Sequence, residues 1–258
     1  MTKLPISSQL NKSAHKENER LNGADQMKLA IMQPYFFPYI GYFQLIAAVD
    51  LFIVYDNIKY TKKGWINRNR MLQNGKDVMF SLPLKSDSDH LDVCQRELST
   101  NFNRDKFLNQ FKGAYRRAPY FEQTFPLVEQ IARYEDTNLF RYLHHAIVKT
   151  CKHLGITTEI RSSSDIAIDH TLKNQDKVLA LCEAVGANTY VNAIGGAVLY
   201  SKETFREKGI DLKFIQSKPF EYAQFCDAFV PWLSMIDVMM FNPPDALQAC
   251  ISTNYELI

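Results

Sequence analysis

The sequence of 258 residues predicts an α/β fold built on a parallel sheet, and two βαβ patterns support this prediction. An apolar run at residues 28–33 is followed by helical spacing of apolar residues over 39–49 and by a second apolar run at 51–56. The same alternation returns between residues 157 and 216. Continuous apolar runs are typical of strands buried on both faces, and a helix between two of them indicates a parallel crossover.

The region between these patterns predicts a β-hairpin and then a helical insertion. Asn74 and Gly75 stand between two β-rich runs, which is a strong signal for a tight hairpin turn. Residues 103–154 carry apolar positions at helical spacing, interrupted at Pro119 and after Tyr134, and predict three helices. The remaining expected elements are strands at 157–162, 188–192 and 211–216 and helices at 173–185, 202–208, 232–241 and 244–251.

Composition limits the classes of function. Residues 1–26 are polar and non-periodic, so we expect a disordered extension without a signal peptide and a single α/β domain over 27–258. A net charge of +2 gives no argument for DNA binding, and no apolar run reaches the roughly 20 residues of a membrane span. Five scattered cysteines without a CxxC pair predict reduced core thiols in a cytoplasmic protein and no metal site.

Strand ends select the first candidate site residues, because open parallel sheets bind ligands at the carboxyl ends of their strands. A glycine pair after a strand lets the backbone approach a phosphate. The candidates at the four strand ends are Gln33, Tyr35, Tyr39 and Tyr42; then Asp56, Asn57, Lys59 and Tyr60; then residues 162–170; and then Asn192, Gly195 and Gly196.

The first crossover begins QPYFFPYIGYFQ and is unusually aromatic. Its residues 39–42, YIGY, stand where folds of the nucleotidylyltransferase (HUP) type carry H-x-G-H, with the glycine kept and both histidines replaced by tyrosine. The spacing indicates a similar Rossmann-like core, but neutral tyrosines lack the charge that stabilises a triphosphate. We expect these aromatic side chains to form a wall for a flat or sugar-like ligand; packing of the first helix is the alternative.

The densest polar cluster is KKGWINRNR at residues 62–70. Lys63, Arg68 and Arg70 are suited to holding a diphosphate, and Trp65 to stacking on a base or sugar, a role that Tyr42 could share. The amides of Asn67 and Asn69 could read hydroxyl groups. A solvated hairpin arm is the alternative reading, and an RNA-binding patch is a weaker one.

His170 ends the segment RSSSDIAIDH after a predicted strand. A histidine in such a loop could act as a general base near neutral pH, with Asp56 as its orienting carboxylate or as the base itself. A capping or surface histidine is the alternative.

Four segments in order, QPYFFPYIGYFQLI, DNIKYTKKGWINRNR, LCEAVGANTY and FVPWLSMIDVMMFN, resemble the WbqC-like protein family, and the resemblance runs over nearly the whole chain from Met27. Members are associated with gene clusters for bacterial O-antigen (lipopolysaccharide) and related surface glycans. The resemblance implies a cytoplasmic transferase that attaches an aminoacyl or acyl group to the amine of a dTDP-linked 4-amino-4,6-dideoxy sugar.

For such a transferase the chemistry assigns roles to the candidates. His170 or Asp56 would be the base, and Asn67, Gln33 or backbone amides at Gly195 and Gly196 would stabilise the oxyanion. We expect no tightly bound cofactor. The acyl donor could be a thioester on a carrier, an aminoacyl-tRNA or an ATP-activated acid. The alternatives are an ATP-dependent ligase or nucleotidyltransferase and a non-catalytic nucleotide-sugar-binding protein.

Overall fold

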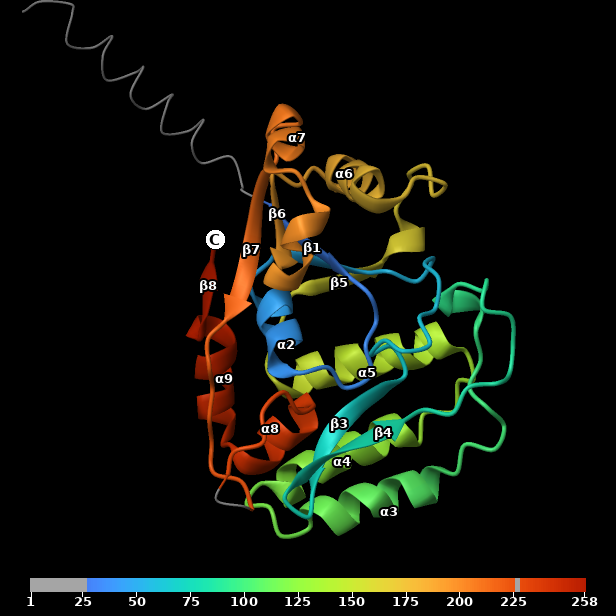
Figure 1. Cartoon of the computed structure of the whole chain (residues 1–258), viewed down its shortest axis with the longest axis vertical. Coiled ribbons are helices and arrows are strands. Elements are labelled where there is room, and N and C mark those ends of the chain that lie inside the picture. The colour runs from blue at the N-terminus through green and yellow to red at the C-terminus, as the bar shows by residue number, and fades with distance from the viewer. Residues whose placement is uncertain (1–26, 226–227) are drawn as a thin grey trace, which may run out of the picture.

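A computed structural model describes residues 27–225 and 228–258 and has a six-stranded sheet at its centre (Figure 1). The strand order is β5-β2-β1-β6-β7-β8; β8 is antiparallel to β7, and the other neighbours are parallel. The strands are β1 (Lys28–Met32), β2 (Leu51–Val54), β5 (Glu159–Ser162), β6 (Thr189–Ala193), β7 (Asp211–Ser217) and β8 (Tyr255–Leu257). The predicted parallel, Rossmann-like core is confirmed. The expected disorder of residues 1–26 lies outside the described residues.

Helices cover both faces of the sheet, because successive strand residues point to opposite sides. Ala30 and Phe52 belong to one apolar cluster with α2 (Ile40–Ala47), α5 (Leu139–His153) and α9 (Pro244–Thr253). Leu29 and Leu51 belong to a second cluster with α6 (Asn174–Val185) and α7 (Lys202–Glu207). The protein is therefore a three-layer α/β structure around its sheet (Figure 1).

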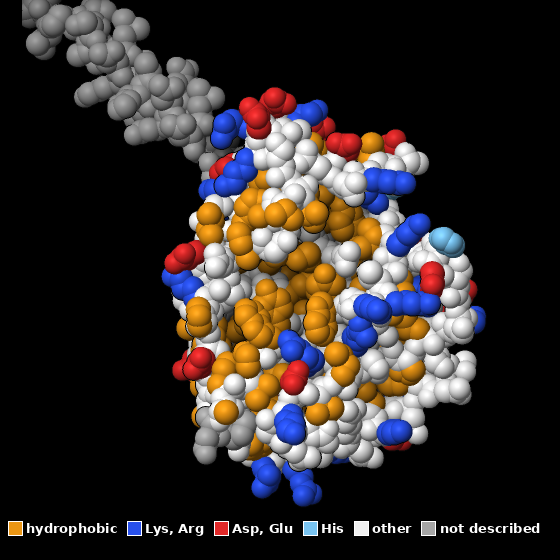
Figure 2. Space-filling model, in the orientation of Figure 1, with side chains coloured by type: hydrophobic (Ala, Val, Ile, Leu, Met, Phe, Trp, Pro, Cys, Tyr) orange, Lys and Arg blue, Asp and Glu red, His pale blue; other side chains and the backbone are white. Residues whose placement is uncertain are grey.

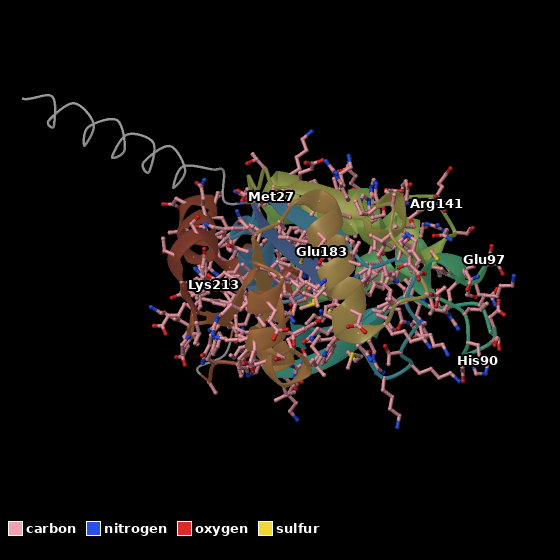
Figure 3. All side chains as sticks on the ribbon, turned by 90° about the horizontal axis from the view of Figure 1, so that it is seen from above. Met27, His90, Glu97, Arg141, Glu183 and Lys213 are labelled. Carbon is pink, nitrogen blue, oxygen red and sulfur yellow. The ribbon has the colours of Figure 1, made fainter. Side chains whose placement is uncertain are left out.

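The predicted hairpin and the three predicted insertion helices are present below the sheet in Figure 1. The hairpin joins β3 (Arg68–Gln73) and β4 (Lys76–Ser81) through Asn74 and Gly75, both at positive φ. Helices α3 (Arg104–Tyr115), α4 (Phe121–Ala132) and α5 fill residues 104–153, and α8 (Met235–Phe241) packs beside them. Figure 3 looks down on the molecule and places Glu97 and His90, between β4 and α3, on the side opposite Lys213 of β7.

Two C-terminal expectations need correction. The helix expected at 232–241 begins only at Met235, because Trp232 has a φ of 61°, which no right-handed helix accommodates. The short strand β8 was not predicted, since three residues are too few to display a period. Three short 3-10 turns also join the elements: η1 (Val93–Gln95), η2 (Ser163–Asp165) and η3 (Ile194–Leu199).

Two observations concern what the described residues do not contain. Among them, no helix combines the length and the apolarity that crossing a bilayer requires. No three His, Cys, Asp or Glu of residues 27–225 and 228–258 gather as a metal site would require. Cys151, Cys182 and Cys250 are buried free thiols and Cys94 is a half-buried one, whereas Cys226 lies outside the described part.

Candidate functional site

A cleft of about 1090 Å³ opens at the carboxyl ends of β1, β2 and β6, and we call it the strand-end cleft. These strands lead into Gln33, Asn57 and Asn192, which all line it. The strand order reverses between β1 and β6, because β2 and β5 lie on one side of β1 and β6 and β7 on the other. This is the position at which open α/β sheets bind ligands. Figure 2 shows a hollow in the middle of the face that is turned to the viewer, with Lys and Arg side chains on its rim.

The lining of the strand-end cleft carries an excess of positive charge. Three lysines, Lys59, Lys173 and Lys177, line it, whereas Asp92 is the acidic residue among the described lining residues. Tyr55 and Tyr200 add aromatic surface. A concave site with more cations than anions favours an anionic ligand. The site residues that the sequence predicted and that line this cleft are Gln33, Tyr35, Lys59, His170, Asn192, Gly195 and Gly196.

Lys177 is a buried cleft residue that sequence reasoning missed. Only 6% of it is exposed, and its Nζ donates to Asn57 Oδ1 at 2.8 Å and to the Asn57 carbonyl at 3.3 Å. Burial lowers the pKa of Lys177, while the charges of Asp56 and Asp92 oppose this shift. Lys177 forms no salt bridge with any described residue. Its two hydrogen bonds to Asn57 use two of its three N–H donors, and its Nζ lies 5.4 Å from the centre of the Tyr55 ring, so one donor remains for a ligand. The sequence feature that could have identified Lys177 is its position four residues before Leu181, which places it on the apolar face of α6.

Asn57 connects Lys177 to His170. Asn57 Oδ1 accepts from Lys177 Nζ, and because an ammonium group can only donate, this fixes which side of the amide carries its N–H groups. Asn57 Nδ2 lies 3.0 Å from His170 Nδ1 and therefore donates to it. Neutral His170 must then carry its proton on Nε2. The ring presents a hydrogen-bond donor to the cleft, which suits an anion or an oxyanion better than the predicted role of general base.

Asp56 does not line the strand-end cleft. Its Oδ1 accepts from Ser163 Oγ at 2.7 Å and from the Ser164 N–H at 3.0 Å. Burial raises the pKa of Asp56, but the hydrogen bonds from Ser164 and Ser163 outweigh burial and lower it overall. A buried carboxylate held in this way anchors the end of β2 to η2, so the structure does not support the predicted role of Asp56 as a base.

The asparagines of the hairpin arm donate hydrogen bonds to backbone carbonyls of the protein itself. Asn69 is buried and donates to the carbonyls of Phe36 and Phe37, at 3.2 and 2.9 Å. Asn67 accepts from the Tyr60 hydroxyl and donates to the Leu82 carbonyl, both at 2.8 Å. Their predicted roles in reading hydroxyls and stabilising an oxyanion are corrected: neither residue, nor Tyr60, lines the cleft.

The hairpin residues that were predicted to hold a diphosphate do not come together in one site. Arg68 donates to the Gly64 carbonyl at 2.9 Å. Arg70 binds Asp77 and the Trp232 carbonyl, and its guanidinium lies 5.5 Å from the Trp65 ring. Together with the exposed Lys63, these residues lie outside the strand-end cleft, so the cations of this cleft come from other elements.

The aromatic residues of the first crossover mostly pack the core. Tyr42 is only 2% exposed and donates to the Gln33 carbonyl at 2.9 Å, so it cannot stack on a ligand. Phe36 and Phe37 are fully buried. Tyr35, which lines the strand-end cleft, and Tyr39 are exceptions. The Tyr39 ring lies over Gly41, where a Cβ would overlap it, and borders another cavity.

Of the two glycines after β6, one stands where the protein leaves no room for a Cβ atom. A Cβ on Gly196 would lie 2.6 Å from Asn192 Nδ2, whereas a Cβ on Gly195 would meet nothing within 4 Å. Asn192 is 5% exposed, and its Oδ1 accepts from the Ala193 N–H at 2.9 Å. Gly196 therefore leaves room for the Asn192 amide in the cleft. The phosphate-binding role of the pair stays a prediction.

Comparison with known proteins agrees with the resemblance of the motifs. The model of the WbqC-like protein family matches residues 33–249. A Mycobacterium tuberculosis protein with the name "Uncharacterized protein Rv1507c" is 27% identical over 230 residues, which cover 86% of this chain and 98% of the relative. No solved structure gives a significant match.

Proposed function

This chain belongs to the WbqC-like protein family, and on that premise we propose that it is a transferase acting on a nucleotide-linked amino sugar. It attaches an acyl or aminoacyl group to the amine of a dTDP-linked 4-amino-4,6-dideoxy sugar for a surface polysaccharide. The observation that carries the proposal is Lys177, a buried ammonium group with an amide partner in a cationic cleft at the switch point of the sheet.

The cleft residues suit the parts of such a substrate. The Lys177 ammonium group retains one free donor for the diphosphate, and Lys173 and Lys59 line the same cleft. The amides of Gln33 and Asn192 are matched to sugar hydroxyls, and Tyr55 offers an apolar wall. A volume of about 1090 Å³ accommodates a nucleotide sugar together with the reactive end of an acyl donor.

The reaction forms a C–N bond between the sugar amine and the carbonyl carbon of an activated acyl group. The bond from that carbon to the leaving group breaks, and the leaving group accepts the proton that the amine loses. The activated group is a thioester, an acyl adenylate or an aminoacyl ester. His170 Nε2–H donates to the oxygen on which negative charge develops, because Asn57 holds the other ring nitrogen.

Thermal-shift measurements with dTDP, UDP, ATP and coenzyme A test the ligand class. We expect dTDP to stabilise the wild type, Lys177→Met to lose this shift, and Lys106→Met, at an exposed position on α3, to keep it. Mass spectrometry of an amino-sugar nucleotide incubated with acyl donors then tests transfer. Absence of any nucleotide response would overturn the proposal, consumption of ATP would indicate a ligase, and binding without transfer would leave a non-catalytic sugar-nucleotide-binding protein.

A further inference from the structure

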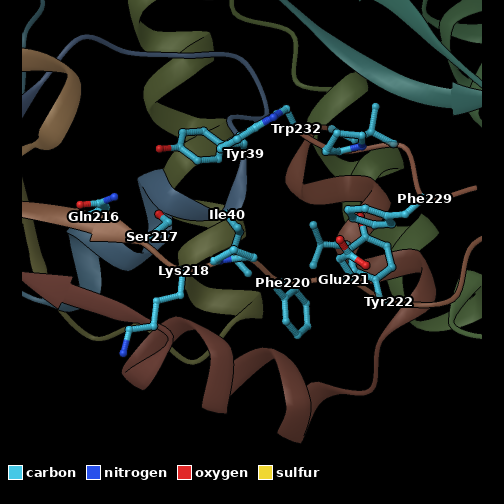
Figure 4. Close-up of a pocket in the computed structure, with 14 residues that line it drawn as sticks. Tyr39, Ile40, Gln216, Ser217, Lys218, Phe220, Glu221, Tyr222, Phe229 and Trp232 are labelled. Carbon is cyan, nitrogen blue, oxygen red and sulfur yellow. The ribbon is translucent and has the colours of Figure 1, made fainter.

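A second cavity, of about 420 Å³, opens where β7 ends, and we call it the aromatic pocket (Figure 4). Gln216 and Ser217 line it from the end of β7, and Tyr39 from the residue before α2. The chain between β7 and α8 completes the wall with Phe220, Tyr222, Phe229 and Trp232. The pocket therefore lies at the same edge of the sheet as the strand-end cleft.

Trp232 is held at this pocket in an unfavourable conformation. Its φ is 61°, and 65% of the residue is exposed. Arg70 Nη2 donates to its carbonyl at 3.1 Å, and the Ser234 N–H donates to the Arg70 carbonyl at 2.9 Å. A positive φ on a bulky residue and an exposed indole are both unfavourable, and such strain persists where the surroundings enforce it and clusters at functional sites.

The rest of the wall is also fixed by the protein itself. Buried Asp237 accepts from the Tyr222 hydroxyl at 2.7 Å and from Gln224 Nε2 at 3.0 Å. Gln224 Oε1 in turn accepts from the Val230 N–H at 2.8 Å. The Tyr39 ring lies 6.1 Å from the Trp232 ring at an angle of 60°. The two rings thus form a preorganised aromatic corner.

The aromatic pocket and the strand-end cleft lie on either side of the loop that follows β1. Tyr35 lines the cleft and Tyr39, four residues further along this loop, lines the pocket. One elongated ligand could therefore reach both. The cleft offers cations and amides, whereas the pocket offers mostly aromatic surface with Gln216 and Ser217 at one end.

We propose that the aromatic pocket binds the pyrimidine base of the nucleotide whose diphosphate lies in the strand-end cleft; this inference rests on the proposed function. A flat base stacks on an exposed indole, which is how aromatic side chains hold bases. Gln216 and Ser217 are donors and acceptors for the edge of the base. A flexible acyl chain gains most from an enclosed cavity, whereas Trp232 presents an open face. Trp232 and Tyr39 take the stacking role that the sequence suggested for Trp65 or Tyr42.

The chain has two tryptophans, which makes the test specific. In the Trp65→Phe variant, Trp232 is the remaining tryptophan. The replacement leaves both cavity linings unchanged, because Trp65 lines neither cavity. We expect thymidine, which has no phosphate, to quench the fluorescence of this variant. By calorimetry, Trp232→Ala should weaken dTDP binding by about tenfold or more, as the loss of one base stack does, and leave pyrophosphate binding unchanged. Trp232→Phe should restore part of the affinity.

The outcomes separate this inference from the proposed function. If Trp232→Ala binds dTDP as tightly as the wild type while Lys177→Met does not, the base subsite is overturned and the diphosphate site stands. If thymidine quenches Trp232 but no diphosphate binds in the cleft, the base subsite stands and the proposed function fails. If thymidine at millimolar concentration leaves the fluorescence of Trp65→Phe unchanged, the inference is overturned.

Discussion

Asn57 and His170 are joined by a hydrogen bond in which Asn57 Nδ2 donates to His170 Nδ1 over 3.0 Å. The direction of this bond follows from the Lys177 ammonium group, which donates to the Asn57 oxygen. One amide thus determines the chemical character of two cleft residues. It leaves His170 a donor, and it holds the Lys177 ammonium group without neutralising it.

The tautomer of His170 is directly testable. We expect ¹⁵N spectra of the neutral imidazole to report the Nε2–H form, with the signal assigned through a His170→Gln variant. In Asn57→Asp the new carboxylate can only accept, so the neutral ring should change to the form that carries its proton on Nδ1. A neutral wild-type ring with its proton on Nδ1 would contradict the assignment of the amide and the donor role of His170.

Lys177 should give the protein two opposite pH dependences. Its pKa is lowered by burial below the ordinary value of 10.5, which the unfolded chain keeps. Between the two values the unfolded state binds more protons, so the contribution of Lys177 to the free energy of unfolding rises with pH. Pyrophosphate affinity should fall in the same window, because the ammonium charge is lost.

Calorimetry from neutral pH up to the ordinary lysine value checks the fall in affinity. Lys177→Arg is the matched variant, because a guanidinium stays charged throughout this range and its affinity should remain nearly constant. If the wild type and Lys177→Arg lose affinity in parallel, another group of the cleft is responsible. Lys177→Met should bind pyrophosphate about tenfold or more weakly at neutral pH, which corresponds to one charge-assisted hydrogen bond.

The two glycines after β6 offer a matched pair of substitutions. Gly196→Ala places a methyl group against Asn192 Nδ2, so either the amide or η3 must move, and we expect a cost of about 1–3 kcal/mol together with weaker ligand binding. Gly195→Ala meets no protein atom within 4 Å and should leave the free energy of unfolding unchanged. Unfolding curves and dTDP titrations of both variants provide the measurement. Equal behaviour of the two variants would show that Asn192 does not need this space.

The sequence predicted the parallel core well because the strands of that core are buried on both faces. A run such as residues 51–54 is apolar at every position, and Asn74 and Gly75 specify a hairpin turn without help from the rest of the fold. The end of the chain was harder to predict. Trp232 adopts its positive φ through contacts with Arg70, and β8 depends on its pairing with β7. Both are tertiary effects.

The site was predicted in part, for a related reason. Strand ends directed attention to Gln33, His170 and Asn192, and the structure places all three in the lining of one cleft. A polar side chain looks the same in sequence whether its partner is a ligand or a backbone carbonyl, so Asn69 was taken for a ligand-binding residue. Lys177 was overlooked because a lysine in a helix is usually solvated.

Asp237 should be a main determinant of stability around the aromatic pocket. Its Oδ1 accepts from the Tyr115 hydroxyl at 2.7 Å, and Tyr115 accepts in turn from the Leu72 N–H at 2.9 Å. Its Oδ2 accepts from Tyr222 and Gln224. In Asp237→Asn, one side of the group becomes a donor that faces other donors, and at least one buried hydrogen bond is lost. We expect a loss of about 1–3 kcal/mol in the free energy of unfolding.

Urea unfolding at neutral pH measures this loss, with Asp245→Asn as the control. Asp245 is exposed in the first turn of α9, and its replacement should change stability by no more than about 0.5 kcal/mol. Because Tyr222 lines the aromatic pocket, Asp237→Asn should also weaken thymidine quenching of Trp232 in the Trp65→Phe background. An Asp237→Asn variant as stable as Asp245→Asn would mean that the three donors find other partners, and that Asp237 does not hold the wall in place.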